Sequence, residues 1–218
     1  MIILSVEEMR KADQHTIAMG TPSRELMRRA AQGVFDSYPG WADAKILVAC
    51  GPGNNGGDGY ALASIMKDRD LDVTVLRVSE KFSEDGAYYF EQCREKDVPV
   101  LMYGTDDVDF EAYQIIVDCL LGTGFSGTPR DSIAAVIAEI NYAHEASPDT
   151  FVISVDINSG MNGDTGEGEN AVVSDLTVSI GYYKTGFFEG EAAELIGSLV
   201  NVEIGIELPP DYTNSSAG

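Results

Sequence analysis

Apolar residues change their spacing along the chain, and the change predicts where helices and strands lie. Two stretches near the amino terminus repeat apolar residues at helical spacing, one after the capping residue Ser5 and one after Pro22. The first helix is expected to end near Met19 and the second near Tyr38. From residue 45 onward, short apolar runs typical of buried strands alternate with helical stretches. The predicted strands are 45–50, 72–77, 99–103, 114–119, 150–156, 174–180 and 198–205, and the predicted helices are 58–68, 82–95 and 130–143.

This alternation predicts an α/β protein with a doubly wound, mostly parallel sheet. Right-handed crossovers place helices on both faces of such a sheet, and the two N-terminal helices would flank it. A length of 218 residues allows one domain of this kind, which is expected to cover residues 1–208. Residues 209–218 contain Pro and Ser and are predicted to be a disordered tail or the remnant of a linker.

Composition narrows the range of partners and compartments. The formal net charge of −22 and the pI of about 4.1 argue against nucleic acid and anionic membrane surfaces as partners. No apolar run approaches the length of a membrane span, and the amino terminus lacks the apolar stretch of a signal peptide. Three cysteines without the spacing of a disulfide framework indicate a reducing compartment, so we expect a soluble cytoplasmic protein.

A glycine-rich stretch, CGPGNNGGDG at residues 50–59, joins the first predicted sheet strand to the next helix. Such a junction lets the backbone approach a ligand and directs free N–H groups at an anion such as phosphate. Its Gly-x-Gly-x-x-Gly spacing alone is a weak dinucleotide signal, because no acidic residue follows the next strand before Glu80. A simple turn is the alternative, but a turn does not need Asn54, Asn55 and Asp58 beside five glycines.

Two further predicted strands stop at an aspartate and enter a Gly-containing loop. Asp118 precedes the loop 122–128, and Asp156 precedes Ser159 and its neighbouring glycine. Because the carboxyl ends of parallel strands meet at one edge of a sheet, these junctions and the glycine-rich stretch are expected to face one pocket. An aspartate that follows buried β-branched residues needs a partner for its carboxylate. The alternative to a functional site is that each aspartate accepts hydrogen bonds from the N–H groups of its own loop.

The polar residues at these junctions favour a hard cation over a transition metal. Asp118, the amide oxygen of Asn55, Ser159 and loop carbonyl groups offer oxygen ligands. The chain has two histidines, His15 and His144, and both are assigned to predicted helices. One carboxylate among neutral oxygens suits a monovalent ion better than calcium or magnesium.

Two residues are candidates for the chemistry. Asp156 is the best general acid or base, because burial raises the pKa of a carboxyl group toward neutrality. Lys184 also follows a predicted strand and could meet a phosphate or pair with an aspartate, with a solvated surface lysine as the alternative. Acyl transfer is not supported, because the chain has no Gly-x-Ser-x-Gly elbow and no well-placed histidine.

Four motifs, taken together and in this order, resemble the YjeF N-terminal domain family. They are the stretch 51–59, Asp118-x-Leu-Leu-Gly-Thr-Gly, Val-Asp156-Ile-x-Ser159-Gly and Lys184-x-Gly. The enzymes of this family are NAD(P)H-hydrate epimerases with a Rossmann-like sheet, and they are often dimeric. The resemblance therefore implies an isomerase of nicotinamide cofactor repair, which interconverts the R and S forms of hydrated NADH and NADPH (NADHX and NADPHX). It also implies a homodimer and a functional partner, the NAD(P)HX dehydratase.

The resemblance carries specific roles onto residues of this chain. We expect catalysis by Asp156 with Lys184, and one potassium ion per subunit on Asn55, Asp118 and Ser159. The expected substrate contacts are Asn54, Asn55, Gly56, Gly57, Asp58, Gly122, Thr123, Gly124, Phe125, Ser126, Gly127, Thr128 and Asp156.

One position departs from the family, and two other functions stay open. Asn158 stands where the family usually has proline, which is expected to loosen the turn that carries Ser159. A non-catalytic nucleotide-binding or scaffold module on the same fold is one alternative, and the presence of Asn55, Asp118 and Asp156 argues against it. A conventional NAD-dependent oxidoreductase is the other, and the missing acidic residue after the second sheet strand argues against it.

Overall fold

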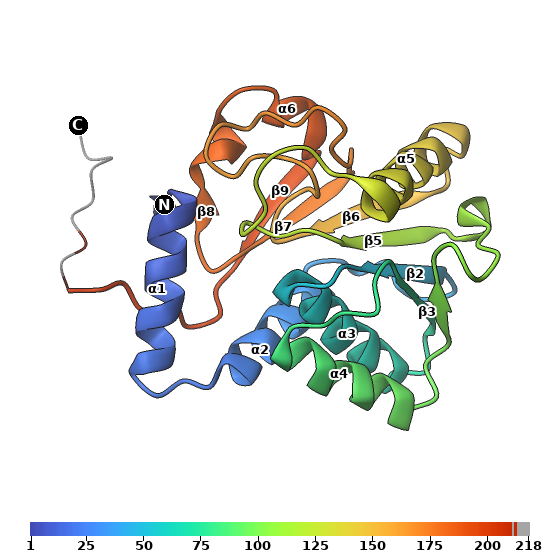
Figure 1. Cartoon of the computed structure of the whole chain (residues 1–218), viewed down its shortest axis with the longest axis horizontal. Helices are drawn as coiled ribbons and strands as arrows, with labels where there is room; N and C mark the ends of the chain where they lie inside the picture. The colour runs from blue at the N-terminus through green and yellow to red at the C-terminus, as the bar shows by residue number, and fades with distance from the viewer. Residues whose placement is uncertain (211, 213–218) are drawn as a thin grey trace.

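A computed structural model of the protein describes residues 1–210 and 212, and its main element is a seven-stranded sheet (Figure 1). Every strand pairing in this sheet is parallel, and the strand order is β4-β3-β2-β5-β6-β7-β9. This confirms the predicted doubly wound, Rossmann-like sheet. The strands are β2 (Lys45–Cys50), β3 (Asp72–Arg77), β4 (Val100–Met102), β5 (Ile115–Cys119), β6 (Phe151–Val155), β7 (Leu176–Ile180) and β9 (Ser198–Val202).

Helices cover both faces of the sheet, as the alternating pattern predicts. In Figure 1, α2 (Ser23–Asp36), α3 (Asn54–Lys67) and α4 (Glu84–Glu95) lie on one face, and α5 (Asp131–Ala146) lies on the other. Alternation along β2 explains the two layers, because successive side chains of a strand point to opposite faces. Ile46 and Val48 of β2 belong to the apolar core under α2 and α3, whereas Leu47 belongs to the core under α5.

The amino-terminal segment is tied to the far end of the chain. The strand β1 (Ile3–Leu4) pairs in parallel with β8 (Tyr183–Lys184) as a separate two-stranded sheet. Ser5 then caps α1 (Val6–Ala18) in the predicted capping box with Glu8. The sequence did not reveal either strand, because a two-residue strand has no measurable period. This pairing places α1 beside the carboxyl edge of the main sheet and not on one of its faces.

The prediction for the start of the third helix was wrong. The helix α3 begins at Asn54 and not at residue 58, so part of the glycine-rich stretch is helical. Glycine is required there because the helix packs closely on its neighbours. A Cβ atom at Gly56 would lie 2.0 Å from the carbonyl oxygen of Gly51, and one at Gly59 would lie 2.7 Å from the sulfur of Cys50. Close packing therefore outweighs the low helix propensity of glycine.

The remaining elements are short. They are η1 (Phe110–Ala112), η2 (Thr185–Phe188) and α6 (Ala192–Leu195), and the sequence predicted none of them. The last sheet strand ends at Val202, earlier than predicted. The predicted tail, 209–218, falls largely on residues 211 and 213–218, which lie outside the described residues. No helix in the described part of the chain is both long enough and apolar enough for a membrane span.

Candidate active site

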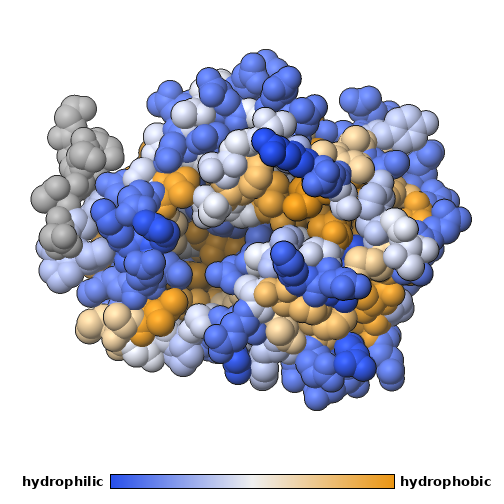
Figure 2. Space-filling model, viewed as in Figure 1, coloured by the Kyte–Doolittle hydropathy of each residue, from blue (hydrophilic) through white to orange (hydrophobic). Residues whose placement is uncertain are grey.

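A cavity of about 590 Å³ opens at the carboxyl ends of β2, β5 and β6, which are neighbours in the sheet. The predicted convergence of the three strand-end junctions is therefore present. Its apolar wall comes largely from α1, α2 and the segments around β7 and β9, and Figure 2 shows this apolar hollow beside α1. The predicted site residues that line it are Asn54, Asn55, Asp58, Gly122, Thr123, Gly124, Phe125 and Asp156.

A second cavity, of about 240 Å³, lies on the other side of the loop 122–128. It shares Phe125 with the larger cavity and contains three predicted substrate contacts, Ser126, Gly127 and Thr128. Two other predicted contacts line neither cavity. Gly56 faces Gly51, and Gly57 faces the end of the Met27 side chain, so both glycines make room for packing.

The first turn of α3 presents backbone donors to the larger cavity. Its N-cap residue is Gly53, and no side chain caps this helix end. The first N–H groups of a helix have no partner within the helix, so here they are free to bind a ligand. The junction is held in place by close contact, because a Cβ atom at Gly51 would lie 1.8 Å from the carbonyl oxygen of Leu120. This arrangement suits an anionic group such as phosphate.

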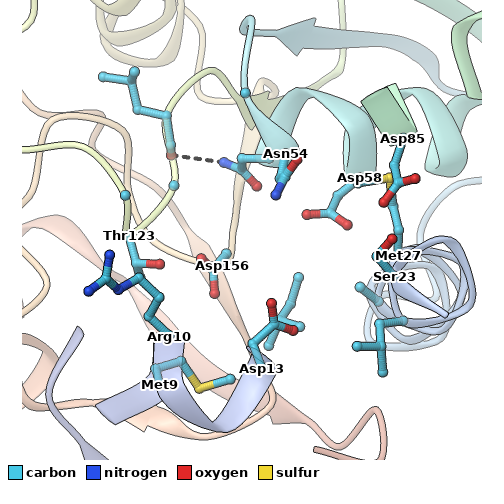
Figure 3. Close-up of a pocket in the computed structure, with 18 of the residues that line it drawn as sticks. Met9, Arg10, Asp13, Ser23, Met27, Asn54, Asp58, Asp85, Thr123 and Asp156 are labelled. Atoms are coloured by element: carbon cyan, nitrogen blue, oxygen red, sulfur yellow. Dashed lines mark hydrogen bonds between the residues drawn. The ribbon is translucent and has the colours of Figure 1, made fainter. Parts of the chain in front are cut away.

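Asp156 lies at the centre of the site (Figure 3). Its backbone has a φ of +68°, a left-handed conformation that is uncommon for residues other than glycine and is often found at functional sites. Its N–H donates to the carbonyl oxygen of Val178 at 2.8 Å, which fixes the turn after β6. Its Oδ1 atom forms an ion pair with Lys184.

Lys184 is fully buried behind Asp156, so the surface-lysine alternative is wrong. The ammonium group also donates to the carbonyl oxygen of Ile180 at 2.9 Å and to the hydroxyl of Ser179 at 3.3 Å. These contacts account for its three protons, and Lys184 does not line the cavity. It therefore acts through Asp156, as a residue that positions the carboxylate.

Asp13, Asp58 and Asp85 also line the cavity, and the surroundings of Asp13 and Asp58 alter their acidity. Burial raises the pKa of Asp58 well above its ordinary value, the charges of Asp156 and Asp13 raise it further, and Lys184 partly opposes them. Burial also raises the pKa of Asp13, with a smaller contribution from Asp156. The sequence reasoning did not select Asp13, because the β1–β8 pairing brings α1 to the site. An available signal was its position four residues after the buried Met9, on the apolar side of an amphipathic helix.

Arg10 was also not selected from the sequence. Among the described residues that line the larger cavity, it carries the one Lys or Arg side chain. Its guanidinium donates to Glu7 at 2.6 Å on the exposed side of α1, and Figure 3 shows it beside Thr123. A cation at this position offsets the strongly negative net charge where an anionic ligand would enter.

Asp118 belongs to a polar cluster beneath the loop that follows β5. Its carboxylate is completely buried and accepts hydrogen bonds from the N–H and hydroxyl of Ser159, the hydroxyl of Ser154 and the N–H of Leu120. The bond from Leu120 is the loop cap considered from the sequence, and the others come from β6 and its loop. Burial raises the pKa of Asp118, although these hydrogen bonds oppose the shift.

Asn55 contacts the same loop as this polar cluster. Its amide nitrogen donates to the carbonyl oxygen of Leu121 at 2.8 Å, and the hydroxyl of Ser159 contacts that oxygen at 3.2 Å. The Oδ1 atom of Asn55 is buried and accepts no hydrogen bond from the described residues. A buried polar atom without a partner is unusual, and a hard cation would satisfy it. Of the predicted ligands, Asn55 thus offers a free oxygen close to Ser159, whereas the oxygens of Asp118 and Ser159 already accept hydrogen bonds, so the cation stays a prediction.

Asn158 does not loosen its turn, contrary to expectation. Its amide nitrogen donates to the carbonyl oxygens of Val172 and Leu195, each at 2.9 Å, and to the hydroxyl of Ser174 at 3.0 Å. Its Oδ1 accepts from Thr177 at 2.7 Å. Four hydrogen bonds to three segments fix the loop that carries Ser159 as firmly as a restricted φ angle would.

The fold and the site define a class of protein, a Rossmann-like α/β domain. The start of a helix without a side-chain cap lies where its strand order reverses, between β2 and β5. The chain belongs to the YjeF-related protein N-terminus family, whose model matches residues 23–186.

Several relatives of this chain have names that refer to NAD(P)H hydrates. A protein named NAD(P)H-hydrate epimerase in Weissella koreensis is 33% identical over 95% of this chain and 93% of its own length. A protein of the same name in Limosilactobacillus fermentum is 33% identical over 90% of this chain and 94% of its own length. The bifunctional NAD(P)H-hydrate repair enzyme Nnr of Coxiella burnetii is 31% identical, and the match covers 94% of this chain but 42% of that protein. The crystal structure of yeast ynu0 (YNL200c) has the same fold, with a TM-score of 0.76 at 22% identity over 92% of this chain and 87% of its own.

Proposed function

We propose that the protein is an NAD(P)H-hydrate epimerase, an isomerase that interconverts the R and S forms of NADHX and NADPHX in cofactor repair. Membership of the family and the names of relatives that match over nearly their full length support this function. The single observation that carries it is the pairing of Asp156 with the buried Lys184 at the cavity where β2, β5 and β6 end.

The cavity offers separate surfaces for the two parts of the substrate. The free N–H groups of α3, the loop 122–125 and Arg10 would bind the pyrophosphate. The apolar wall, which includes Met9 and Met27, would receive the hydrated nicotinamide ring and exclude bulk water. This division places the hydroxyl-bearing carbon of the ring near Asp156.

Asp156 would perform acid–base work at that carbon. Proton transfer to the hydroxyl assists its departure or the opening of the ring, and re-addition from the other face inverts the centre. Lys184 holds the carboxylate in place from behind, and the left-handed backbone directs it into the cavity. No oxidation or reduction is involved, in keeping with an isomerase.

A potassium ion would stabilise the site without taking part in the reaction. The Oδ1 atom of Asn55 and the oxygens of Asp118 and Ser159 would hold it, one ion per subunit. When bound, the ion supplies a fixed positive charge that ties the start of α3 to the loops after β5 and β6. The rest of the binding surface then depends on these three elements.

A nicotinamide dehydrogenase is less well supported by the site. The strand β3 ends at Arg77, whose guanidinium lies over the rings of Phe82 and Phe90 at 4.2 and 4.6 Å. An acidic side chain that would bind a ribose hydroxyl is absent at this described strand end. Relatives named bifunctional repair enzymes support the NAD(P)HX dehydratase as a functional partner. The homodimer and the cytoplasmic location stay predictions.

The test is an epimerase assay in which chromatography resolves the two ring epimers. The purified protein should convert (R)-NADHX to the S form faster than the spontaneous reaction, and Asp156→Asn should lower turnover by at least ~100-fold while substrate affinity is kept. Failure of the wild-type protein to convert either hydrate would contradict the epimerase function. It would favour the alternative, a non-catalytic binding module on the same fold. Near-normal turnover of Asp156→Asn would remove this residue from the chemistry.

A further inference from the structure

The cavity contains more carboxyl groups than its cations can neutralise. Asp13 comes from α1, Asp58 from α3 and Asp156 from the end of β6, and Figure 3 shows all three directed at the same open space. Lys184, which is the one fully buried Lys or Arg in the part of the chain that the structure describes, is bonded to Asp156. Among the described residues, none donates a hydrogen bond to the carboxyl group of Asp13 or Asp58. Asp13 and Asp58 therefore face the carboxylate of Asp156, and neither has a cation or a hydrogen-bond donor of its own.

The other charged groups around this space do not neutralise Asp13 or Asp58. On α1, Arg10 is bonded to Glu7, and on α4, Asp85 is paired with Arg24 at 3.1 Å. Beneath α3, Cys50 and Cys119 are buried, and burial raises the pKa of both thiols, so they stay neutral.

Of the two carboxyl groups without a donor, Asp58 has the more strongly raised pKa, mainly because of burial. Carboxylates around one partly apolar cavity repel one another, which favours the protonated form of the group that is most affected. Asp58 is affected by the charges of both Asp156 and Asp13, whereas Asp13 is affected by that of Asp156. A carboxyl group that is kept neutral can donate a proton to a substrate, as a carboxylate cannot.

We propose that Asp58 is the general acid of the epimerisation, with Asp156 as the general base and Asp13 as a residue that keeps Asp58 protonated. This assignment rests on the proposed epimerase function and divides the acid–base work described above, so that Asp156 keeps the role of base and Asp58 protonates the hydroxyl. With this assignment, the two faces of the nicotinamide ring would meet different carboxyl groups. Asp58 projects from α3, and Asp156 projects from the loop after β6, across the cavity (Figure 3).

The proposed step balances in atoms and charge. The Asp58 carboxyl gives its proton to the ring hydroxyl, the carbon–oxygen bond breaks and water leaves, while the lone pair of the ring nitrogen forms a carbon–nitrogen double bond. A water molecule adds to the opposite face of the carbon and gives its proton to the Asp156 carboxylate. One turnover thus moves one proton from Asp58 to Asp156, and exchange with solvent in the open cavity restores the starting state.

The test compares Asp58→Asn, Asp58→Glu and Asp13→Asn with the wild-type protein, using NADHX as substrate across pH 5 to 9. Wild-type turnover should fall as the pH rises through the pKa of Asp58. Asp58→Asn should lose about 100-fold and also lose this alkaline limb, and Asp58→Glu should recover part of the activity. Asp13→Asn should keep most of the activity but move the alkaline limb to lower pH, because it removes a neighbouring negative charge.

Asp68→Asn is the matched control, since Asp68 caps the other end of the same helix and pairs with Lys96 at 2.6 Å on the surface. Its turnover and pH profile should equal those of the wild-type protein. Turnover of Asp58→Asn within threefold of wild type, or the same alkaline limb in both proteins, would overturn the proposal. An inactive wild-type protein would contradict the epimerase function instead, so the two failures are distinguishable.

Thermal unfolding can detect the proton on the Asp58 carboxyl group without an activity assay. Because the pKa of Asp58 is raised above its ordinary value of 3.8 in the folded protein, the stability that its proton contributes is complete below that pH and is lost as the pH rises through the raised pKa. Asp58→Asn should therefore unfold roughly 2–4 °C higher than wild type at pH 8 and at about the same temperature at pH 4. A variant that is less stable than wild type by the same amount at both pH values would contradict a protonated Asp58.

Discussion

Asp118 lies near the carboxyl end of β5 and Asp156 directly follows the neighbouring strand β6, yet their surroundings are opposite. Asp118 is completely buried and accepts four hydrogen bonds from serines and backbone N–H groups. Asp156 lies at the cavity surface in a left-handed conformation, with Lys184 as its partner. The comparison shows that an aspartate near the end of a strand predicts which edge of the sheet carries the site. Its role depends on the donors or cations that the fold places around its carboxylate.

The largest expected effect comes from Lys184, the partner that distinguishes Asp156 from Asp118. In Lys184→Met the carboxylate loses its positioning cation, so turnover per folded molecule should fall by about 100-fold, in the range seen when an acid–base group is lost. The KM should change little, because Lys184 does not line the cavity. Steady-state kinetics with NADHX measures both values, and Lys11→Met, on the exposed side of α1, serves as the control. A raised KM with unchanged turnover would instead make Lys184 a binding residue.

A smaller effect, on stability, is expected at Asp118. In Asp118→Asn two of the four donors, one backbone N–H and one serine hydroxyl, would face an NH₂ group in place of an acceptor oxygen; the hydroxyl can turn to accept, but the N–H cannot. A buried donor without a partner costs about 1–3 kcal/mol, which corresponds to a decrease of roughly 2–12 °C in the unfolding temperature. Thermal unfolding of the variant tests this value. An unchanged unfolding temperature with lost turnover would make Asp118 a catalytic residue like Asp156, and the contrast between the two would disappear.

The smallest effect is expected from the cation next to Asp118. At a potassium concentration ten times its dissociation constant, binding to the folded protein adds about 1.4 kcal/mol, or roughly 3–6 °C, compared with tetramethylammonium at equal ionic strength. Asn55→Ala should abolish this difference, because it removes the buried Oδ1 ligand. Equal unfolding temperatures in the two salts, or a potassium effect that persists in Asn55→Ala, would contradict the cation site. A sodium series separates potassium from monovalent ions in general.

Local pattern was enough to predict the sheet and the convergence of its strand ends. Each sheet strand is an apolar run, and the rule that parallel strands present their carboxyl ends at one edge brought Asp118, Asp156 and Asn55 together. Asp13 and Arg10 were missed for a physical reason, since they reach the cavity through a two-residue pairing between β1 and β8, almost the whole chain apart. The burial of Lys184 depends on the same pairing, which leaves no trace in the local sequence.

The start of α3 shows a different limit. Glycine lowers helix propensity, so the local rule started the helix at residue 58, after Gly56 and Gly57. In the structure the glycines are helical because Met27 and the sulfur of Cys50 lie too close for a larger residue at Gly57 and Gly59. Only the tertiary packing shows that these glycines allow close contact and do not mark a loop.

The central claim is that the edge formed by β2, β5 and β6 binds the nucleotide hydrate with its ring at Asp156. A crystal structure of the Asp156→Asn variant with bound NADHX tests it most directly, because the slowed reaction preserves the substrate. We predict the pyrophosphate at the first turn of α3 and the hydroxyl-bearing ring carbon facing residue 156 and Asp58. A hydrate bound elsewhere on the molecule, with this cavity empty, would contradict the account.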